Sequence, residues 1–144
     1  YRRLRADGER AILPLVMDLA DPSPGGGWRA RERASFAERA HADAVLALAV
    51  VHHLAIGRNV PLPEVLDWLV EFLAAAGPTG RLVVEFVHPD DPMAQRLLAN
   101  KPAGLFPDYR REEFERLLAQ RCTIIDRVEL SCGTRTLYAG APRG

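Results

Sequence analysis

The chain has 144 residues, about the length of one ordinary domain. Hydrophobic residues make up 48% of it and charged residues 26%, a balance that excludes an intrinsically disordered protein. The 19 basic residues equal the 19 acidic ones, so nucleic acid is disfavoured as the main partner. No apolar run reaches the roughly 18 residues of a membrane span. Two cysteines, Cys122 and Cys132, make no disulfide framework and are expected to be reduced, in the cytoplasm.

Five segments have the apolar pattern of β-strands. Three are nearly continuous apolar runs, as in strands buried on both faces of a parallel sheet: residues 11–17, 44–51 and 81–87. Residues 123–130 and 134–140 alternate more and are joined by three residues, which predicts an antiparallel hairpin. Pro14 restricts the first strand to an edge or bulged position, because proline has no backbone N–H.

The segments between these strands predict helices, over residues 1–7, 29–41, 64–76, 91–98 and 108–118. The third is the clearest, because Glu64, Asp67 and Glu71 form one polar stripe. Asp91 and Asp108 are expected to cap the last two helices. Strands that alternate with helices predict an α/β fold with a mainly parallel sheet.

Polar side chains follow three of the predicted strands. Asp18 follows the first strand, His52 and His53 follow the second, and Glu85 and His88 close the third. Ligands of open α/β sheets bind beyond the carboxyl ends of the strands. We therefore expect these side chains near one rim of the sheet.

Each of these side chains has a structural interpretation beside the functional one. Asp18 either binds an amine or ribose hydroxyl of a ligand, or caps the loop that follows it. One histidine is expected to be structural and bonded to backbone, while the other serves as a general base. Adjacent residues of an extended strand point to opposite faces, so His52 and His53 predict no shared metal site. Glu85 in an apolar strand indicates either an ion pair with an arginine or catalysis.

Three stretches carry a resemblance to a known family: residues 12–28 (ILPLVMDLADPSPGGGW), 42–56 (ADAVLALAVVHHLAI) and 80–92 (GRLVVEFVHPDDP). Their order and spacing resemble the class I S-adenosylmethionine-dependent methyltransferases, with the greatest similarity to a bacterial branch. The resemblance covers nearly the whole chain, residues 1–141. It implies a Rossmann-like sheet that ends in an antiparallel hairpin, S-adenosylmethionine as cofactor, and methyl transfer to an acceptor that the sequence does not identify.

The resemblance also implies which residues bind the cofactor. Asp18 matches the acidic residue that contacts the adenine amino group in this family, and Leu19 supplies a backbone contact. Ala49 and Val50 match the strand end beneath the sulfonium side of the cofactor.

The implied catalytic residues follow the next strand ends. His52 matches the position where substrate is presented, and it is the expected base if a proton must leave the acceptor. His53 is expected to orient that turn. Glu85 and His88 match a strand end where substrate contacts are usual. Methyl transfer itself needs mainly alignment of the reacting atoms, so a dedicated base is not obligatory.

The family's glycine-rich GxGxG loop and the acidic residue for the ribose do not occur in the chain, and residues 1–7 correspond to the helix that follows them. We therefore expect residues 1–144 to form a single partial domain that lacks the N-terminal strands and belongs to a longer methyltransferase. A non-catalytic domain that acts through protein interaction, or as a homodimer through an exposed sheet edge, is the alternative. A metal-dependent hydrolase built on the histidines is the third hypothesis.

Overall fold

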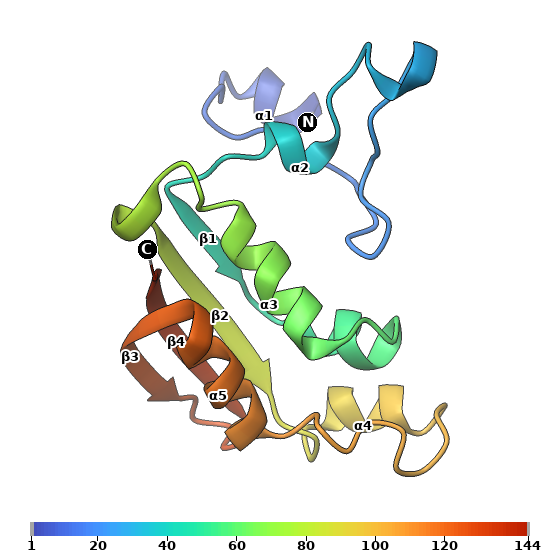
Figure 1. The fold of residues 1–144 in the computed structure, drawn as a ribbon, viewed down its shortest axis with the longest axis vertical. Helices are drawn as coiled ribbons and strands as arrows, with labels where there is room; N and C mark the ends of the chain where they lie inside the picture. Colours follow the sequence, from blue (N-terminus) through green and yellow to red (C-terminus); the bar gives the residue numbers. More distant parts are fainter. Residues whose placement is uncertain (1, 144) are drawn as a thin grey trace.

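The computed structural model describes residues 2–143 and contains a four-stranded mixed sheet (Figure 1). Its strands are β1 (Ala44–Ala47), β2 (Arg81–Val87), β3 (Cys122–Glu129) and β4 (Arg135–Pro142), in the spatial order β1-β2-β4-β3. β1 and β2 are parallel, whereas β4 is antiparallel to both β2 and β3. The α/β class and the antiparallel hairpin are thus confirmed. The expectation of a mainly parallel sheet is wrong, because only one strand pair is parallel.

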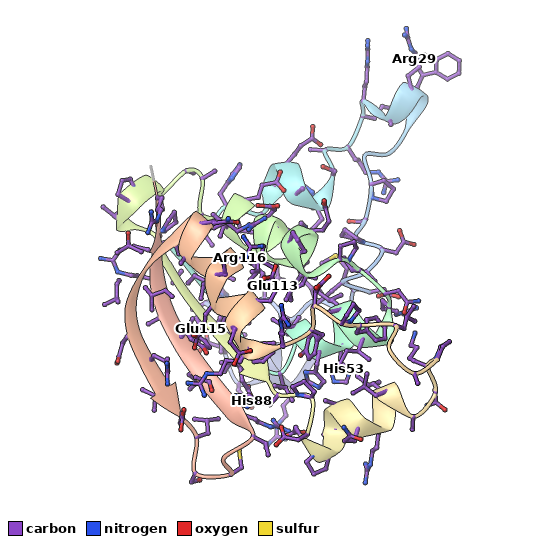
Figure 2. The ribbon with its side chains drawn as sticks, turned by 60° about the horizontal axis from the view of Figure 1, so that its bottom comes forward. Arg29, His53, His88, Glu113, Glu115 and Arg116 are labelled. Atoms are coloured by element: carbon purple, nitrogen blue, oxygen red, sulfur yellow. The ribbon has the colours of Figure 1, made fainter. Side chains whose placement is uncertain are left out.

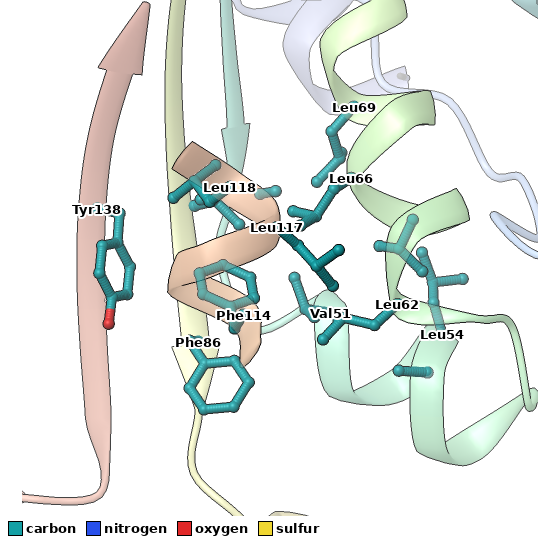
Figure 3. Packing of buried hydrophobic residues seen from close by; sticks show 14 of the residues in the cluster. Val51, Leu54, Leu62, Leu66, Leu69, Phe86, Phe114, Leu117, Leu118 and Tyr138 are labelled. Carbon is teal, nitrogen blue, oxygen red and sulfur yellow. The ribbon is translucent and has the colours of Figure 1, made fainter. Parts of the chain in front are cut away.

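Two helices, α3 (Leu62–Glu71) and α5 (Arg111–Arg121), cover the same face of the sheet (Figure 1). Phe86 of β2 packs under α5, with its ring centroid 4.7 Å from that of Phe114. Phe114 in turn lies 5.3 Å from Tyr138 of β4. Leu117 of α5 and Leu66 of α3 meet between the helices (Figure 3). The main core therefore lies between the sheet and these two helices.

The remaining elements are short. They are α1 (Arg2–Ala6), η1 (Trp28–Ala30), α2 (Phe36–Arg39), η2 (His53–Gly57), η3 (Gly77–Thr79) and α4 (Pro92–Leu98). α4 confirms the helix predicted over residues 91–98, and the Asp91 carboxylate caps it by accepting a hydrogen bond from the Met93 N–H. Within residues 2–143, no helix combines the length and the apolar character needed to cross a membrane.

The helix predicted over residues 29–41 is wrong. Arg29 and Ala30 both have a φ of 57°, which lies outside the right-handed helical region. Helical backbone resumes only at Phe36, where Ser35 and Glu38 form a capping box. The other helix boundaries also shift: α3 spans Leu62–Glu71 rather than residues 64–76, and α5 spans Arg111–Arg121. The predicted Asp108 cap is wrong, because Arg110 holds the N-cap position of α5 and its side chain makes no cap hydrogen bond.

The strand predicted over residues 11–17 is wrong as well. These residues join no strand ladder of the described chain, and Leu13 is 69% exposed while Val16 is fully exposed. Pro14 lacks the N–H that a ladder requires, and no strand within residues 2–143 lies beside this segment. An apolar run with no neighbouring strand has no partner for its backbone groups and no face on which to be buried.

Candidate functional site

The carboxyl end of β1 is set by an unusual backbone turn. β1 was expected to continue to residue 51, but it ends at Ala47, and Ala49 has a φ of 54°. The backbone N–H of Ala49 donates a 2.8 Å hydrogen bond to Oε2 of Glu85, which lies on the neighbouring strand β2. From Val51 the chain is helical and continues into η2. Because a left-handed conformation costs an L-residue about 1–2 kcal/mol, the buried Glu85 carboxylate stabilises a strained turn.

A hollow of about 450 Å³ opens beside this turn. Its walls come from segments that are far apart in the sequence: Asp18 and Leu19, Ala49 and Val50, and His53 at the start of η2. Leu54 and Arg58 follow from the same helical stretch, and Leu97 of α4 closes one side. All four residues that the resemblance assigned to cofactor binding thus lie around one hollow.

The Asp18 carboxylate has two partners in this hollow. Oδ1 accepts a 3.0 Å hydrogen bond from the backbone N–H of Ala20, and Oδ2 forms an ion pair with the Arg58 guanidinium. The structural interpretation of Asp18 as a cap of its own loop is therefore confirmed. The side chain remains 46% exposed, so solvent or a ligand can still reach the carboxylate.

His52 and His53 do not point to opposite faces, because neither lies in extended backbone. Their ring centroids are 4.1 Å apart, with an angle of 37° between the ring planes. His53 is exposed and lines the hollow, whereas His52 is buried, with 1% of its surface exposed. Burial, His53 and Arg135 lower the pKa of His52 to about 4. His52 is therefore neutral at pH 7.

The expectation that one of the two histidines bonds to backbone is not met by the buried His52. Its Nδ1 atom finds no hydrogen-bond partner among the described residues. A buried nitrogen without a hydrogen-bond partner either destabilises the fold or bonds to a group outside these residues. His53, labelled in Figure 2, is the histidine of the pair that lines the hollow.

Glu85 belongs to a buried cluster of charged groups beneath the hollow. Its Oε1 accepts a 3.1 Å hydrogen bond from Nη1 of Arg135 on β4, which confirms the predicted ion pair with an arginine. Nε of Arg135 donates to Oδ2 of Asp91 at 2.8 Å, and the Thr134 hydroxyl donates to the same oxygen. These hydrogen bonds, that from Arg135 above all, hold the pKa of Asp91 well below its usual range. One arginine thus neutralises two buried carboxylates.

Arg135 and the second role of Asp91 were missed by sequence reasoning. Asp91 was predicted only as a helix cap, and Arg135 was not singled out. Arg135 reaches both carboxylates because β4 pairs with β2 in the register that sets it opposite Val87. Antiparallel register is a property of the folded sheet, and the apolar pattern of the sequence indicates only that the strands exist.

His88, labelled in Figure 2, directly follows β2 and is not among the residues that line the hollow. Its ring Nε2 is 2.9 Å from the Thr136 hydroxyl of β4, and its backbone N–H donates to the Thr134 carbonyl. His88 therefore ties β2 to β4 and does not line the hollow.

The donor set of the hollow suits an organic ligand better than a metal ion. Asp18 offers hydrogen-bond acceptors, His53 offers an exposed imidazole, and Leu19 and Leu54 offer apolar surface. The part of the chain that the structure describes holds no group of three His, Cys, Asp or Glu side chains arranged to bind a metal. Both Cys122, which is buried, and Cys132, which is exposed, are free thiols.

The chain resembles a known protein over most of its length. The chain is similar to "Nodulation protein NoeA" of Rhizobium meliloti (strain 1021), with 43% identity over 127 residues. The matched region covers 88% of this chain but 25% of the relative, so the chain spans about a quarter of that protein's length. No known family model matches the chain, and no solved structure matches it.

Proposed function

We propose that this chain forms the adenine side and the acceptor face of an S-adenosylmethionine-dependent methyltransferase. The observation that carries the proposal is the hollow of about 450 Å³ that gathers Asp18, Leu19, Ala49 and Val50 from two distant segments. These are the four residues to which the resemblance assigns cofactor contacts. The hairpin of β3 and β4, which follows the parallel pair β1 and β2, is also what that family leads one to expect.

The residues around the hollow fit the adenosine part of the cofactor. An adenine ring is flat and apolar on its faces and carries an amino group at its edge. The exposed Asp18 carboxylate would accept a hydrogen bond from that amino group, while Leu19 and Leu54 would pack on the ring. Arg58 holds the carboxylate in place through its ion pair. When bound, S-adenosylmethionine supplies a methyl group on a sulfonium ion.

The remaining residues act on the acceptor or on the geometry of the site. His53 is the exposed histidine of the hollow, and we assign to it the contact with the acceptor and its proton. Glu85 is a positioning residue, because its carboxylate fixes the turn at Ala49. His52, for which a role as base was expected, remains a candidate only if the acceptor reaches its buried ring. We place the reaction in the cytoplasm, where thiols such as Cys132 stay reduced.

The proposal is tested by titrating S-adenosylhomocysteine into the full-length protein that carries these residues, in a calorimeter. We expect Asp18→Ala to weaken binding about tenfold or more, because a charge-assisted hydrogen bond contributes about 1.5–3 kcal/mol. Asp21→Ala is the matched control, since Asp21 is exposed, lies three residues away and does not line the hollow. Its affinity should equal that of the wild type.

Two results would contradict the proposal. Absence of binding by the full-length wild-type protein would overturn the methyltransferase assignment. Binding that Asp18→Ala and Asp21→Ala affect equally would place the cofactor elsewhere. Circular dichroism of both variants checks that neither substitution unfolds the protein.

A non-catalytic role in self-association is the second candidate, and the exposed edge of the sheet favours it. β1 pairs with β2 on one side only within residues 2–143, and its neighbourhood exposes Leu46 and Leu48 by 66% and 48%. An unpaired apolar edge can add a strand from a second copy. Sedimentation velocity distinguishes the two cases, because this role requires a concentration-dependent dimer that Leu46→Lys abolishes.

A further inference from the structure

A second hollow, of about 490 Å³, lies between the start of α3 and the segment that leads into α5. One wall is formed by Val60, Pro61 and Pro63, and the other by Leu105, Phe106 and Pro107. In the chain, the first wall follows η2 and the second follows α4. None of the residues that line this hollow lines the first one.

The walls of the second hollow are held in place by contacts of their own. Three of the lining residues are prolines, whose backbone has little freedom. The Tyr109 hydroxyl donates a 2.8 Å hydrogen bond to the Val87 carbonyl, which fixes the ring that lines the hollow. Lys101, the one lysine of the chain, joins the two walls. Its Nζ donates to Oδ1 of Asn59 at 2.8 Å and lies 6.0 Å from the centre of the Phe106 ring. The hollow is thus formed before any ligand arrives.

The charges of the lining are of one sign. Asp108 and Glu113 contribute carboxylates to the lining itself, while the Lys101 ammonium, which joins the walls at the edge of the hollow, is engaged by the Asn59 amide oxygen. Arg116 neutralises Glu113 through an ion pair of 2.6 Å. No hydrogen bond within residues 2–143 engages the exposed Asp108 carboxylate. It lies close enough to Arg116 to contribute to the raised pKa of that guanidinium, but its oxygens are open to a ligand.

We propose that the second hollow binds a small organic molecule with a compact apolar body, such as a ring, and one protonated amine. The apolar walls and the Tyr109 and Phe106 rings would hold the body, and Asp108 would pair with the amine. The volume lies within the range of about 300–1,000 Å³ that is usual for small-molecule sites. A stable protein partner would need a broader contact surface, of roughly 800 Å² on each side, so we assign the hollow to a small molecule. This inference goes beyond the proposed methyl transfer and does not depend on it.

The single lysine provides a reporter for the test. Reductive methylation of the 144-residue chain with ¹³C-formaldehyde labels Lys101 and the amino terminus, so the NMR spectrum holds one side-chain signal from the edge of the hollow. The probes are 2-phenylethylamine, the neutral 2-phenylethanol and the anionic 3-phenylpropionate. We expect 2-phenylethylamine to shift the Lys101 signal with the highest affinity, and 3-phenylpropionate with the lowest.

Variants locate the two parts of the site. Asp108→Asn should reduce the affinity for 2-phenylethylamine about tenfold, to that of 2-phenylethanol, while Asp90→Asn, an exposed control outside the hollow, should not change it. Leu105→Arg should abolish binding of the amine, and because Leu105 is 49% exposed this substitution spares the core. Equal affinities for the amine and the carboxylate, no shift with any probe, or an Asp108→Asn variant that binds like the wild type would each overturn the proposal.

Discussion

The strand β2 and the segment 11–17 are both apolar runs of seven residues, yet they lie in opposite surroundings. β2 has β1 on one side and β4 on the other, and α3 and α5 cover its face (Figure 3). Val84, in the middle of β2, is completely buried, whereas Val16 is completely exposed. Segment 11–17 is the more apolar of the two, since β2 carries the charged Arg81 and Glu85, so apolar composition does not decide which of them becomes a strand.

The difference comes from what each segment meets. The backbone groups of β2 bond to two neighbours, and its one charged side chain below the surface, Glu85, meets Arg135. Segment 11–17 meets no strand of the described chain, and Pro14 removes one of its donors. The stability of the sheet therefore depends on pairing and on the charged cluster beside β2, and substitutions at these places should have the largest effects.

Among the substitutions near β2, removal of Arg135 should lower the free energy of unfolding most. Arg135→Met leaves the buried Glu85 and Asp91 carboxylates without their common partner, and breaking a buried ion pair costs about 3–5 kcal/mol. Urea denaturation followed by circular dichroism measures this loss in the free energy of unfolding. Arg127→Met is the matched control on β3, because its ion pairs lie at the surface, and it should cost less than about 1 kcal/mol. Equal effects of the two variants would show that the buried cluster does not anchor β2.

Acid should destabilise the protein through His52 before it protonates Asp91. The pKa of His52 is about 4 in the folded protein and about 6.5 when unfolded, so between these values the unfolded chain binds more protons. Stability is therefore complete above pH 6.5 and falls as the pH drops toward 4, by about 3 kcal/mol. His53 and Arg135 disfavour protonation of His52, while Asp91 and Glu85 oppose them.

Urea denaturation at several pH values measures this dependence. His52→Gln should flatten the curve between pH 6.5 and 4, and His41→Gln, which changes an exposed histidine, should leave it as in the wild type. The loss that remains in acid in His52→Gln should come from carboxyl groups whose pKa is lowered by their partners, Asp91 above all and also Asp67 and Glu115, because their stabilisation disappears when they are protonated. A wild-type curve that is flat between pH 7 and 4 would contradict the burial of a neutral His52.

The same substitution in the two apolar segments makes the comparison quantitative. Val84→Ala removes two buried methyl groups from β2 and should cost about 2 kcal/mol, whereas Val16→Ala should change the free energy of unfolding by less than about 0.5 kcal/mol. Thermal or urea denaturation of both variants provides the measurement. A large effect of Val16→Ala would mean that segment 11–17 is buried in solution, for example against another chain.

Part of the fold follows from the sequence alone. The bounds of β2 were predicted to the residue, and α4 with its Asp91 cap was predicted as found, because both depend on local pattern. The hairpin of β3 and β4 was predicted within two residues. The strand over 11–17 failed because an apolar pattern cannot reveal whether a neighbouring strand exists.

The site shows the same division. Asp18 and Ala49 were expected near one rim and lie around one hollow, and the ion pair of Glu85 was among the expectations. The orientation of His52 was wrong because β1 ends early, and Arg135 was missed because it depends on strand register. The residue types at the site could thus be predicted from the sequence, whereas contacts that depend on long-range strand pairing could not.

The turn that ends β1 should show a smaller effect than the core of β2. Ala49→Gly should raise the free energy of unfolding by about 0.5–1 kcal/mol, because glycine adopts a φ of 54° without strain, although the unfolded chain gains some freedom. Ala47→Gly, two residues earlier in regular strand backbone, should lower it by a similar amount or more, since that buried methyl group is lost. Opposite signs for the two substitutions would show that the backbone is strained at Ala49. If both variants are destabilised to the same extent, Ala49 does not adopt a left-handed conformation, and the part of the hollow that it lines has a different shape.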